Sequence, residues 1–193
     1  MALVRRSCAA LALAFVAVAA TADEPLTILD EGDTAALWRP VAETIAMPAY
    51  PGVVADKSED VCVSVGYLLQ ADGSTSDFAV LDAWGSKAAK AKPTDPHFLP
   101  YSQNALAAVQ RWRFQSIAGA SAKVRPVYTS ATFAFSTSGA DMEGLKGRCR
   151  ISDLSAFIRK AQEAAYRRGD INKSSIDRNR VENPATLRGT KSP

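Results

Sequence analysis

The chain reads VCVSVGYLLQADGSTSDFAVLDAW from Val61 to Trp84, a pattern typical of two β-strands joined by a tight turn. Val61 to Gln70 is rich in the β-branched, aromatic and other apolar residues that buried strands favour. Asp72-Gly73 is a hairpin signal, because both central residues of a type I′ turn need positive φ. Ser76 to Trp84 alternates apolar and polar residues. We therefore expect it to return as the second, antiparallel strand.

A helix and two more strands are predicted further along the chain. Tyr101 to Arg111 repeats apolar residues at intervals of three and four, which predicts a helix. Trp112-Arg113-Phe114 then alternates, so the chain should leave the helix and enter a strand. Val124 to Ser136 is the last predicted strand. One face of it should pack on the helix and consists of Val127, Thr129, Ala131, Phe133 and Phe135.

Several short motifs follow one another along the chain. They are Pro48-x-Tyr50-Pro51-x-x-x-Ala55, Asp72-Gly73, Ala105-x-x-Ala108-x-x-x-Trp112-x-Phe114 and Phe133-x-Phe135. Together and in this order they resemble the carboxy-terminal domain of TonB-family proteins. The resemblance covers Pro48 to Ser136, about half of the chain without its leader. It implies an α+β fold in which a small antiparallel sheet is backed by helices.

The resemblance also implies a function. In the family this domain lies in the periplasm and binds outer-membrane receptors, whose extended segment adds as a strand to the sheet. On this chain the recipient edge would be the strand from Val124 to Phe135, and Pro126 suits an edge because proline has no N–H to donate. The expected partner is an outer-membrane receptor in transmembrane transport or another envelope protein. The implied partner-binding residues are Tyr50, Pro51, Val124, Val127, Tyr128, Thr129, Ser130 and Ala131.

The chain departs from the energy transducers of this family in several ways. Such a transducer carries a membrane helix and a long proline-rich span, whereas this chain has ten prolines and no run of them. Met47 stands where the family often has glutamine, and Ser116 stands where it commonly has proline. The single histidine, His97, lies outside the leader. The expected role is therefore partner binding without energy transduction.

The first 22 residues have the pattern of a signal peptide. Arg5 and Arg6 precede an apolar run from Cys8 to Ala20, and Ala20-Thr21-Ala22 has the small-x-small form that signal peptidase cleaves. The run of thirteen residues is shorter than the roughly 17–25 that span a bilayer. We expect a mature chain that starts at Asp23 in the periplasm. An uncut inner-membrane anchor that faces the periplasm is the alternative.

The predicted domain, residues 48–136, has segments on both sides. Residues 23–47 form a lead-in with a short helix near Thr34 to Trp38 and an apolar stretch from Val41 to Met47. Residues 137–169 form a linker and an amphipathic helix from Ile151 to Arg168, which Gly169 should end. This helix either docks on the domain or contacts a partner or a membrane surface. Residues 170–193 should be a disordered basic tail.

Cleavage of the leader would leave two cysteines, Cys62 and Cys149. An even pair in an exported protein favours a disulfide. The alternative is a buried Cys62 that packs as a small apolar group and a free Cys149.

Charge and composition exclude several classes of function. The formal net charge is +3, or +1 without the leader, which does not favour a nucleic-acid partner. From Arg167 to the end, the chain has seven basic residues and three acidic ones. A second hypothesis is therefore a scaffold protein whose tail contacts anionic envelope polymers and whose sheet edge is covered by the Ile151 helix or a second copy of the chain. The chain has no glycine-rich phosphate loop, and we predict no enzyme, no metal and no cofactor. A thiol–imidazole enzyme built on His97 is a distant third hypothesis.

Overall fold

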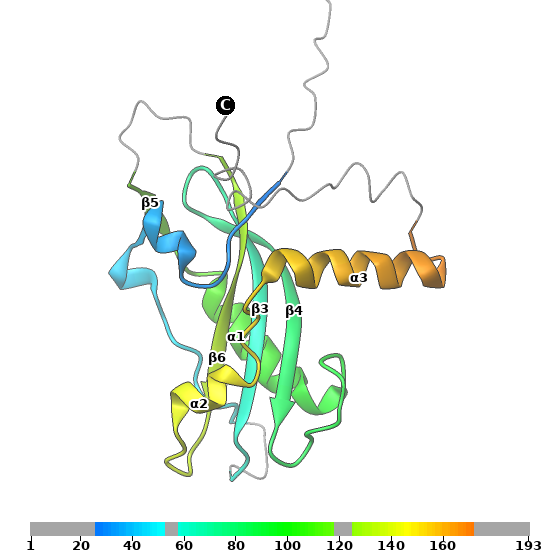
Figure 1. The fold of residues 1–193 in the computed structure, drawn as a ribbon. Helices are drawn as coiled ribbons and strands as arrows, with labels where there is room; N and C mark the ends of the chain where they lie inside the picture. The colour runs from blue at the N-terminus through cyan, green and yellow to red at the C-terminus, as the bar shows by residue number, and fades with distance from the viewer. Residues whose placement is uncertain (1–25, 53–57, 118–124, 172–193) are drawn as a thin grey trace, which may run out of the picture.

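The computed structural model describes residues 26–52, 58–117 and 125–171, which form an α+β fold (Figure 1). A four-stranded sheet with the order β1-β6-β3-β4 is its centre, and a two-stranded sheet of β2 and β5 lies beside it. The α+β class expected from the sequence is confirmed.

The predicted strands build the large sheet. β3 (Val61–Leu69) pairs antiparallel with β4 (Thr75–Gly85) on one side and with β6 (Val127–Phe135) on the other. β1 (Thr27–Ile28) lies parallel to the start of β6. The sheet is therefore mixed rather than antiparallel as predicted, because the lead-in adds a strand in the direction of β6.

The lead-in also supplies half of the small sheet. β2 (Trp38–Pro40) pairs antiparallel with β5 (Phe114–Ser116), which follows the predicted exit from the helix. Two short 3₁₀ helices, η1 (Asp33–Ala36) and η2 (Ala42–Thr44), flank β2. The short helix predicted near Thr34 to Trp38 is thus the 3₁₀ helix Asp33–Ala36, and Trp38 belongs to strand β2 instead.

Helices cover both faces of the large sheet (Figure 1). η3 (Pro96–Phe98) leads into α1 (Leu99–Val109) on one face. α2 (Met142–Gly147) and α3 (Leu154–Arg168) lie on the other, and α3 extends past β4. α3 starts three residues later than predicted, because the Asp153 side chain caps it by accepting from Ala156 N. It ends at Gly169, whose φ is 80°.

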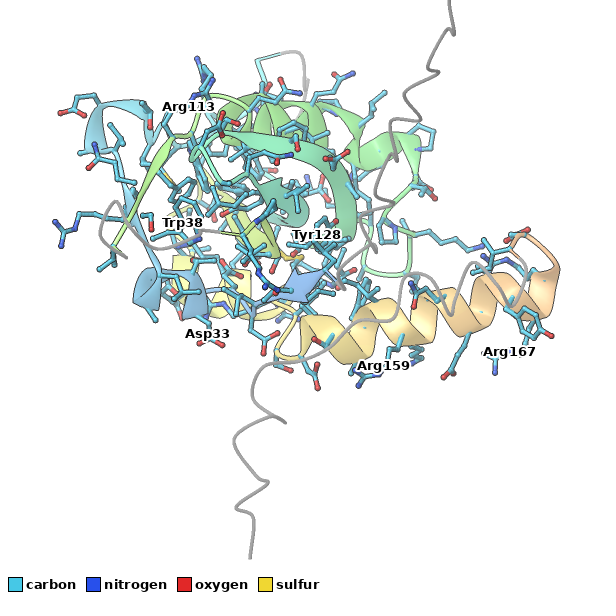
Figure 2. All side chains as sticks on the ribbon, turned by 90° about the horizontal axis from the view of Figure 1, so that it is seen from above. Asp33, Trp38, Arg113, Tyr128, Arg159 and Arg167 are labelled. Atoms are coloured by element: carbon cyan, nitrogen blue, oxygen red, sulfur yellow. A yellow bond between two sulfur atoms is a disulfide. The ribbon has the colours of Figure 1, made fainter. Side chains whose placement is uncertain are left out.

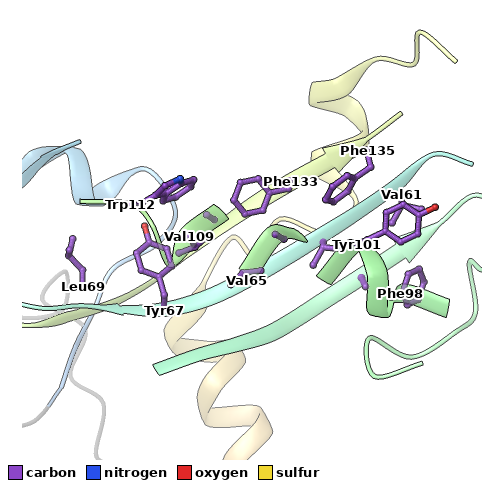
Figure 3. Packing of buried hydrophobic residues seen from close by; sticks show 14 of the residues in the cluster. Val61, Val65, Tyr67, Leu69, Phe98, Tyr101, Val109, Trp112, Phe133 and Phe135 are labelled. Carbon is purple, nitrogen blue, oxygen red and sulfur yellow. The ribbon is translucent and has the colours of Figure 1, made fainter. Parts of the chain in front are cut away.

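The main core lies between the sheet and α1 (Figure 3). Trp112, at the exit of α1, joins the layers: its ring centroid lies 6.1 Å from that of Tyr67 on β3 and 5.6 Å from that of Phe133 on β6. Its indole N–H also donates to the Ala46 carbonyl over 3.0 Å. The lead-in is therefore tied to the core through Ala46.

The turn between β3 and β4 differs from the predicted type I′. Gly73 has a φ of 84°, and Asp77 is the one non-glycine residue with positive φ in the described ranges, so Asp72 keeps a negative φ. The Asp72 carboxylate accepts from the N–H and the hydroxyl of Ser74 over 2.9 and 2.6 Å, and these bonds lower the pKa of that carboxyl. This local bonding stabilises a turn with a single left-handed residue.

Gly73 also contacts β5 closely, which makes it a sensitive position. A Cβ at Gly73 would overlap the backbone carbonyl of Phe114, whose N–H donates to the Gly73 carbonyl over 2.9 Å. We expect Gly73→Ala to lower the free energy of unfolding by about 1–2 kcal/mol for the left-handed φ and by a further 1–3 kcal/mol for the overlap.

Gly139→Ala is the matched control, because Gly139 has a φ of 80° and open space around its Cβ position. Urea unfolding should show the smaller loss for Gly139→Ala. Equal losses for the two variants would contradict the role of the Phe114 contact.

The structure contains the Cys62–Cys149 disulfide expected from the sequence, with a Cα–Cα distance of 5.9 Å. The bond lies on the sheet face opposite α1, in a second apolar cluster with Leu145 of α2. It therefore attaches the segment after α2 to the central strand β3.

We expect the loss of this disulfide to lower the free energy of unfolding substantially. It closes a loop with a sequence separation of 87 residues, for which the chain-entropy model gives about 4.6 kcal/mol. Urea unfolding of a Cys62→Ala/Cys149→Ala variant, beside the oxidised protein, measures the effect. A loss below about 1 kcal/mol would contradict it.

Three predictions concern residues outside the described ranges. They are the signal peptide of residues 1–22, nearly all of the basic tail, and the placement of Val124. In the part of the chain that the structure describes, no helix is both long enough and apolar enough to cross a membrane.

Candidate functional site

The outer edge of β6, the side away from β3, is the edge that the sequence predicts for partner binding. β6 and β3 pair over their full nine-residue lengths without a register shift. On the outer side, β1 pairs with Val127 and Tyr128, and Leu29 N donates to Tyr128 O over 2.9 Å. The strand predicted to be the edge is thus covered at its start by the lead-in rather than by the Ile151 helix.

The backbone groups of β6 beyond Tyr128 continue this edge. The N–H of Thr132 points outward, because it bonds a side chain outside the sheet rather than β3. In an antiparallel ladder, alternate residues direct both backbone groups to the same side. The N–H and C=O groups of Ser130 and Ala134 therefore point outward as well. They are the groups that an added strand would bond.

A carboxylate occupies the middle of this edge. Glu31 accepts from the Thr132 N–H over 2.8 Å and from the Thr132 hydroxyl over 2.6 Å. Its second oxygen also lies 3.7 Å from Nε of Arg150. Glu31 thus bonds the Thr132 N–H as a neighbouring strand carbonyl would.

The chain turns away from β6 directly after this contact. Gly32 has a φ of 99°, and Asp33 N donates to Asp30 O over 3.1 Å. The Asp30 carboxylate accepts from the N–H of Leu154, the first residue of α3, over 2.7 Å. One short segment therefore contacts both β6 and the start of α3.

The side chains predicted on β6 do not form an exposed surface. Val127, Thr129 and Ala131 are buried and lie on the face toward α1. Ser130 is 3% exposed, and its hydroxyl has no hydrogen-bond partner among the described residues. Of these four residues, only Ser130 directs its backbone groups outward, because those of Val127, Thr129 and Ala131 pair with β3.

Tyr128 lies on the opposite face of the sheet from α1. A Cβ at Gly66 of β3 would overlap its hydroxyl, so the ring lies across β3. Burial raises the pKa of the Tyr128 phenol, and the Asp77 carboxylate adds to this effect. Burial, with a smaller contribution from the Glu31 carboxylate, also raises the pKa of Tyr67 on the core face.

Tyr50 and Pro51, also predicted to bind a partner, lie near the other end of β6. The Tyr50 hydroxyl lies 3.0 Å from that of Tyr101 and 3.1 Å from the carbonyl of Glu59. Its ring meets that of Phe135 edge-on, with 6.5 Å between centroids. Pro51 is buried. The structure thus places this pair at the end of the core, away from β1.

We expect Tyr50→Phe to lower the free energy of unfolding by about 1 kcal/mol, because the Glu59 carbonyl and the Tyr101 hydroxyl each lose a hydrogen-bond partner. Tyr166→Phe is the control, since Tyr166 is 48% exposed on α3 and its change should stay within about 0.5 kcal/mol. Thermal or urea unfolding measures both variants. An unchanged stability of Tyr50→Phe would indicate that the hydroxyl is not structural.

The other edge of the sheet, β4, is irregular. Its pairing with β3 has two register shifts, and Asp77 has a φ of 50°. Asp82 is part-buried, and burial raises the pKa of its carboxyl. Bulges and inward-pointing charges are features that protect a strand edge from pairing. The regular edge of β6 is therefore better suited to an added strand.

Two further groups of residues lie away from the β6 edge. A cavity of about 330 Å³ lies beside α2 and is lined by Asp60, Trp84, Asp141 and Arg148, among others. The guanidinium of Arg148 lies 4.3 Å from the Trp84 ring centroid. Charges of both signs line this cavity, which shares no residue with the predicted site.

His97 has a carboxylate as its neighbour. Its Nε2 lies 2.9 Å from the carboxylate of Glu59, which is buried. Cys62 and Cys149 are joined in the disulfide, so neither of these two sulfurs is a free thiol in this structure. The thiol–imidazole arrangement is therefore not formed here.

Comparisons with known proteins found limited similarity. No family model matches the chain, and no curated protein matches it. A solution NMR structure of the Pseudomonas aeruginosa TonB CTD is 18% identical, with a TM-score of 0.42 over 58% of this chain and 96% of that one. The candidate site therefore rests on the contacts described above.

Proposed function

We propose that this chain is a periplasmic protein-binding module that captures an extended segment of an envelope partner by strand addition along β6. The single observation that carries the proposal is the unequal pairing of this strand: nine residues pair with β3, and two pair with β1. The sequence motifs that resemble the TonB family suggest the class of partner, an outer-membrane receptor in transmembrane transport.

The energetics of strand addition fit this edge. A segment paired beyond Tyr128 would bond the outward groups of Ser130, Thr132 and Ala134. Each net hydrogen bond contributes about 0.5–1.5 kcal/mol, so several are needed to offset the ordering of an extended peptide. Main-chain hydrogen bonds would supply the affinity, and the side chains of the partner would supply the specificity.

A second function, a scaffold that contacts anionic envelope polymers, is favoured by one feature of α3. The helix projects from the body of the molecule, and Arg159 and Arg167 lie along its projecting part (Figure 2). Lys160 and Arg168 lie on the same part of the helix. The nearby carboxylates are those of Glu163 and of Asp170, which pairs with Arg168 over 2.8 Å. Loss of envelope association after the four basic residues are replaced, with partner capture unchanged, would support this function.

Site-specific photo-crosslinking tests the capture proposal. Benzoylphenylalanine at Arg125, an exposed position just before β6, should form adducts with an envelope protein in intact cells. The adducts should map by mass spectrometry to one contiguous extended segment of that protein. Ala79, an exposed position on β4, is the control and should give no such adduct. Adducts from Ala79 alone, or adducts scattered over many segments, would contradict capture at β6.

A further inference from the structure

We propose that residues Thr27–Glu31, here called the strap, are a built-in competitor for the β6 edge, with Glu31 as its latch. This inference rests on the proposed function and adds its regulation. A partner would have to displace the strap and supply a new acceptor to the Thr132 N–H. The strap would thus determine how tightly a partner must bind to open the edge and which kind of segment can replace the strap.

The strap already occupies the position of an added strand. Ile28 is 2% exposed and pairs with Tyr128. Leu29 N continues the ladder with its bond to Tyr128 O. Gly32 then directs the chain away, so that the strap covers only the first part of β6 as a strand.

Glu31 attaches the strap to β6 through its charged side chain, beyond the point where the backbone pairing of β1 with β6 ends. Its carboxylate accepts two bonds from Thr132, and its side chain is 22% exposed. Hydrogen bonds to ionised acceptors in partly buried sites are stronger than neutral ones. A single residue therefore provides a large share of the contact between strap and edge.

The latch rests on a part of the molecule that is fixed covalently. Arg150, which faces Glu31, follows Cys149 directly, and the disulfide attaches Cys149 to β3. Asp30 adds a second contact to the first residue of α3. The strap is therefore held on one side by β6 and on the other by the segment between α2 and α3.

Displacement is feasible because the strap is short. A tethered segment competes at an effective concentration on the order of millimolar, and partner affinity is reduced by the fraction of molecules in which the edge is open. A partner that pairs along all of β6 makes more main-chain bonds than the strap. Such a partner forms hydrogen bonds to residues of β6 that the strap does not pair with.

The strap also indicates the chemistry of the segment that would replace it. That segment would run parallel to β6 and place an apolar residue where Ile28 lies, and its main chain would take the place of the Glu31 carboxylate at the Thr132 N–H. The fitting partner is therefore an extended segment with an apolar residue where its pairing begins.

Amide exchange in the full chain tests the latch. Glu31→Ala removes the carboxylate, and we expect the Thr132 amide to exchange roughly 10- to 100-fold faster by NMR. Glu43→Ala, an exposed carboxylate in the same lead-in, is the control and should leave this rate unchanged. Glu31→Gln, which keeps one acceptor oxygen, serves if the alanine variant does not fold. An unchanged Thr132 rate in folded Glu31 variants would overturn the proposal.

A peptide with the sequence LTILDE, residues 26–31 of this chain, tests the chemistry of the edge. It should bind Glu31→Ala at least about 10-fold more tightly than the unchanged protein, because the tethered competitor is weakened. The peptide LTILDA, without the last carboxylate, should lose at least about 10-fold of this affinity. Equal binding of LTILDE to both proteins would overturn the competition.

Crosslinking from Arg125 separates this inference from the proposed function. More adduct in Glu31→Ala than in the unchanged protein supports both. An edge that opens and binds LTILDE without any envelope adduct supports the strap as a competitor and contradicts the proposed function. Equal adduct in both proteins supports the function and overturns the competition.

Discussion

The pairing of β3 with β6 is the interaction on which the rest of the structure depends. Strands from distant parts of the chain align over nine residues, and this alignment creates two faces at once. One face carries the aromatic core under α1, and the other carries Cys62 toward α2. Because side chains alternate along a strand, a shift of one residue would exchange the two faces and break both.

The same pairing leaves the sheet with two unequal edges. β4 is protected by its own irregularities, whereas β6 pairs without a register shift and is covered at its start by another part of the chain. Protection by a separate segment is reversible, and protection by bulges is not. On the proposed function, the edge of β6 is therefore the place where this fold would both avoid unwanted pairing and permit a specific one.

The lead-in connects the core, the small sheet and the candidate site. Ala46 accepts from Trp112, β2 pairs with β5, and Glu31 bonds Thr132. The disulfide fixes the opposite side of the site through Cys149. The candidate site thus depends on segments that lie on both sides of the predicted domain in the sequence.

The sequence by itself determined the elements whose signals are local. The alternation in Val61 to Trp84, the helical repeat before Trp112 and the aromatic face of the last strand predicted β3, β4, α1 and β6, and the cysteine pair predicted the disulfide. The parallel strand β1 and the contact of Glu31 with Thr132, 101 residues apart, had no local signal. A two-residue strand has too few residues for a period, and an acidic residue in a loop usually faces solvent. Only tertiary packing, which brings the lead-in beside β6, decided that the predicted edge is covered.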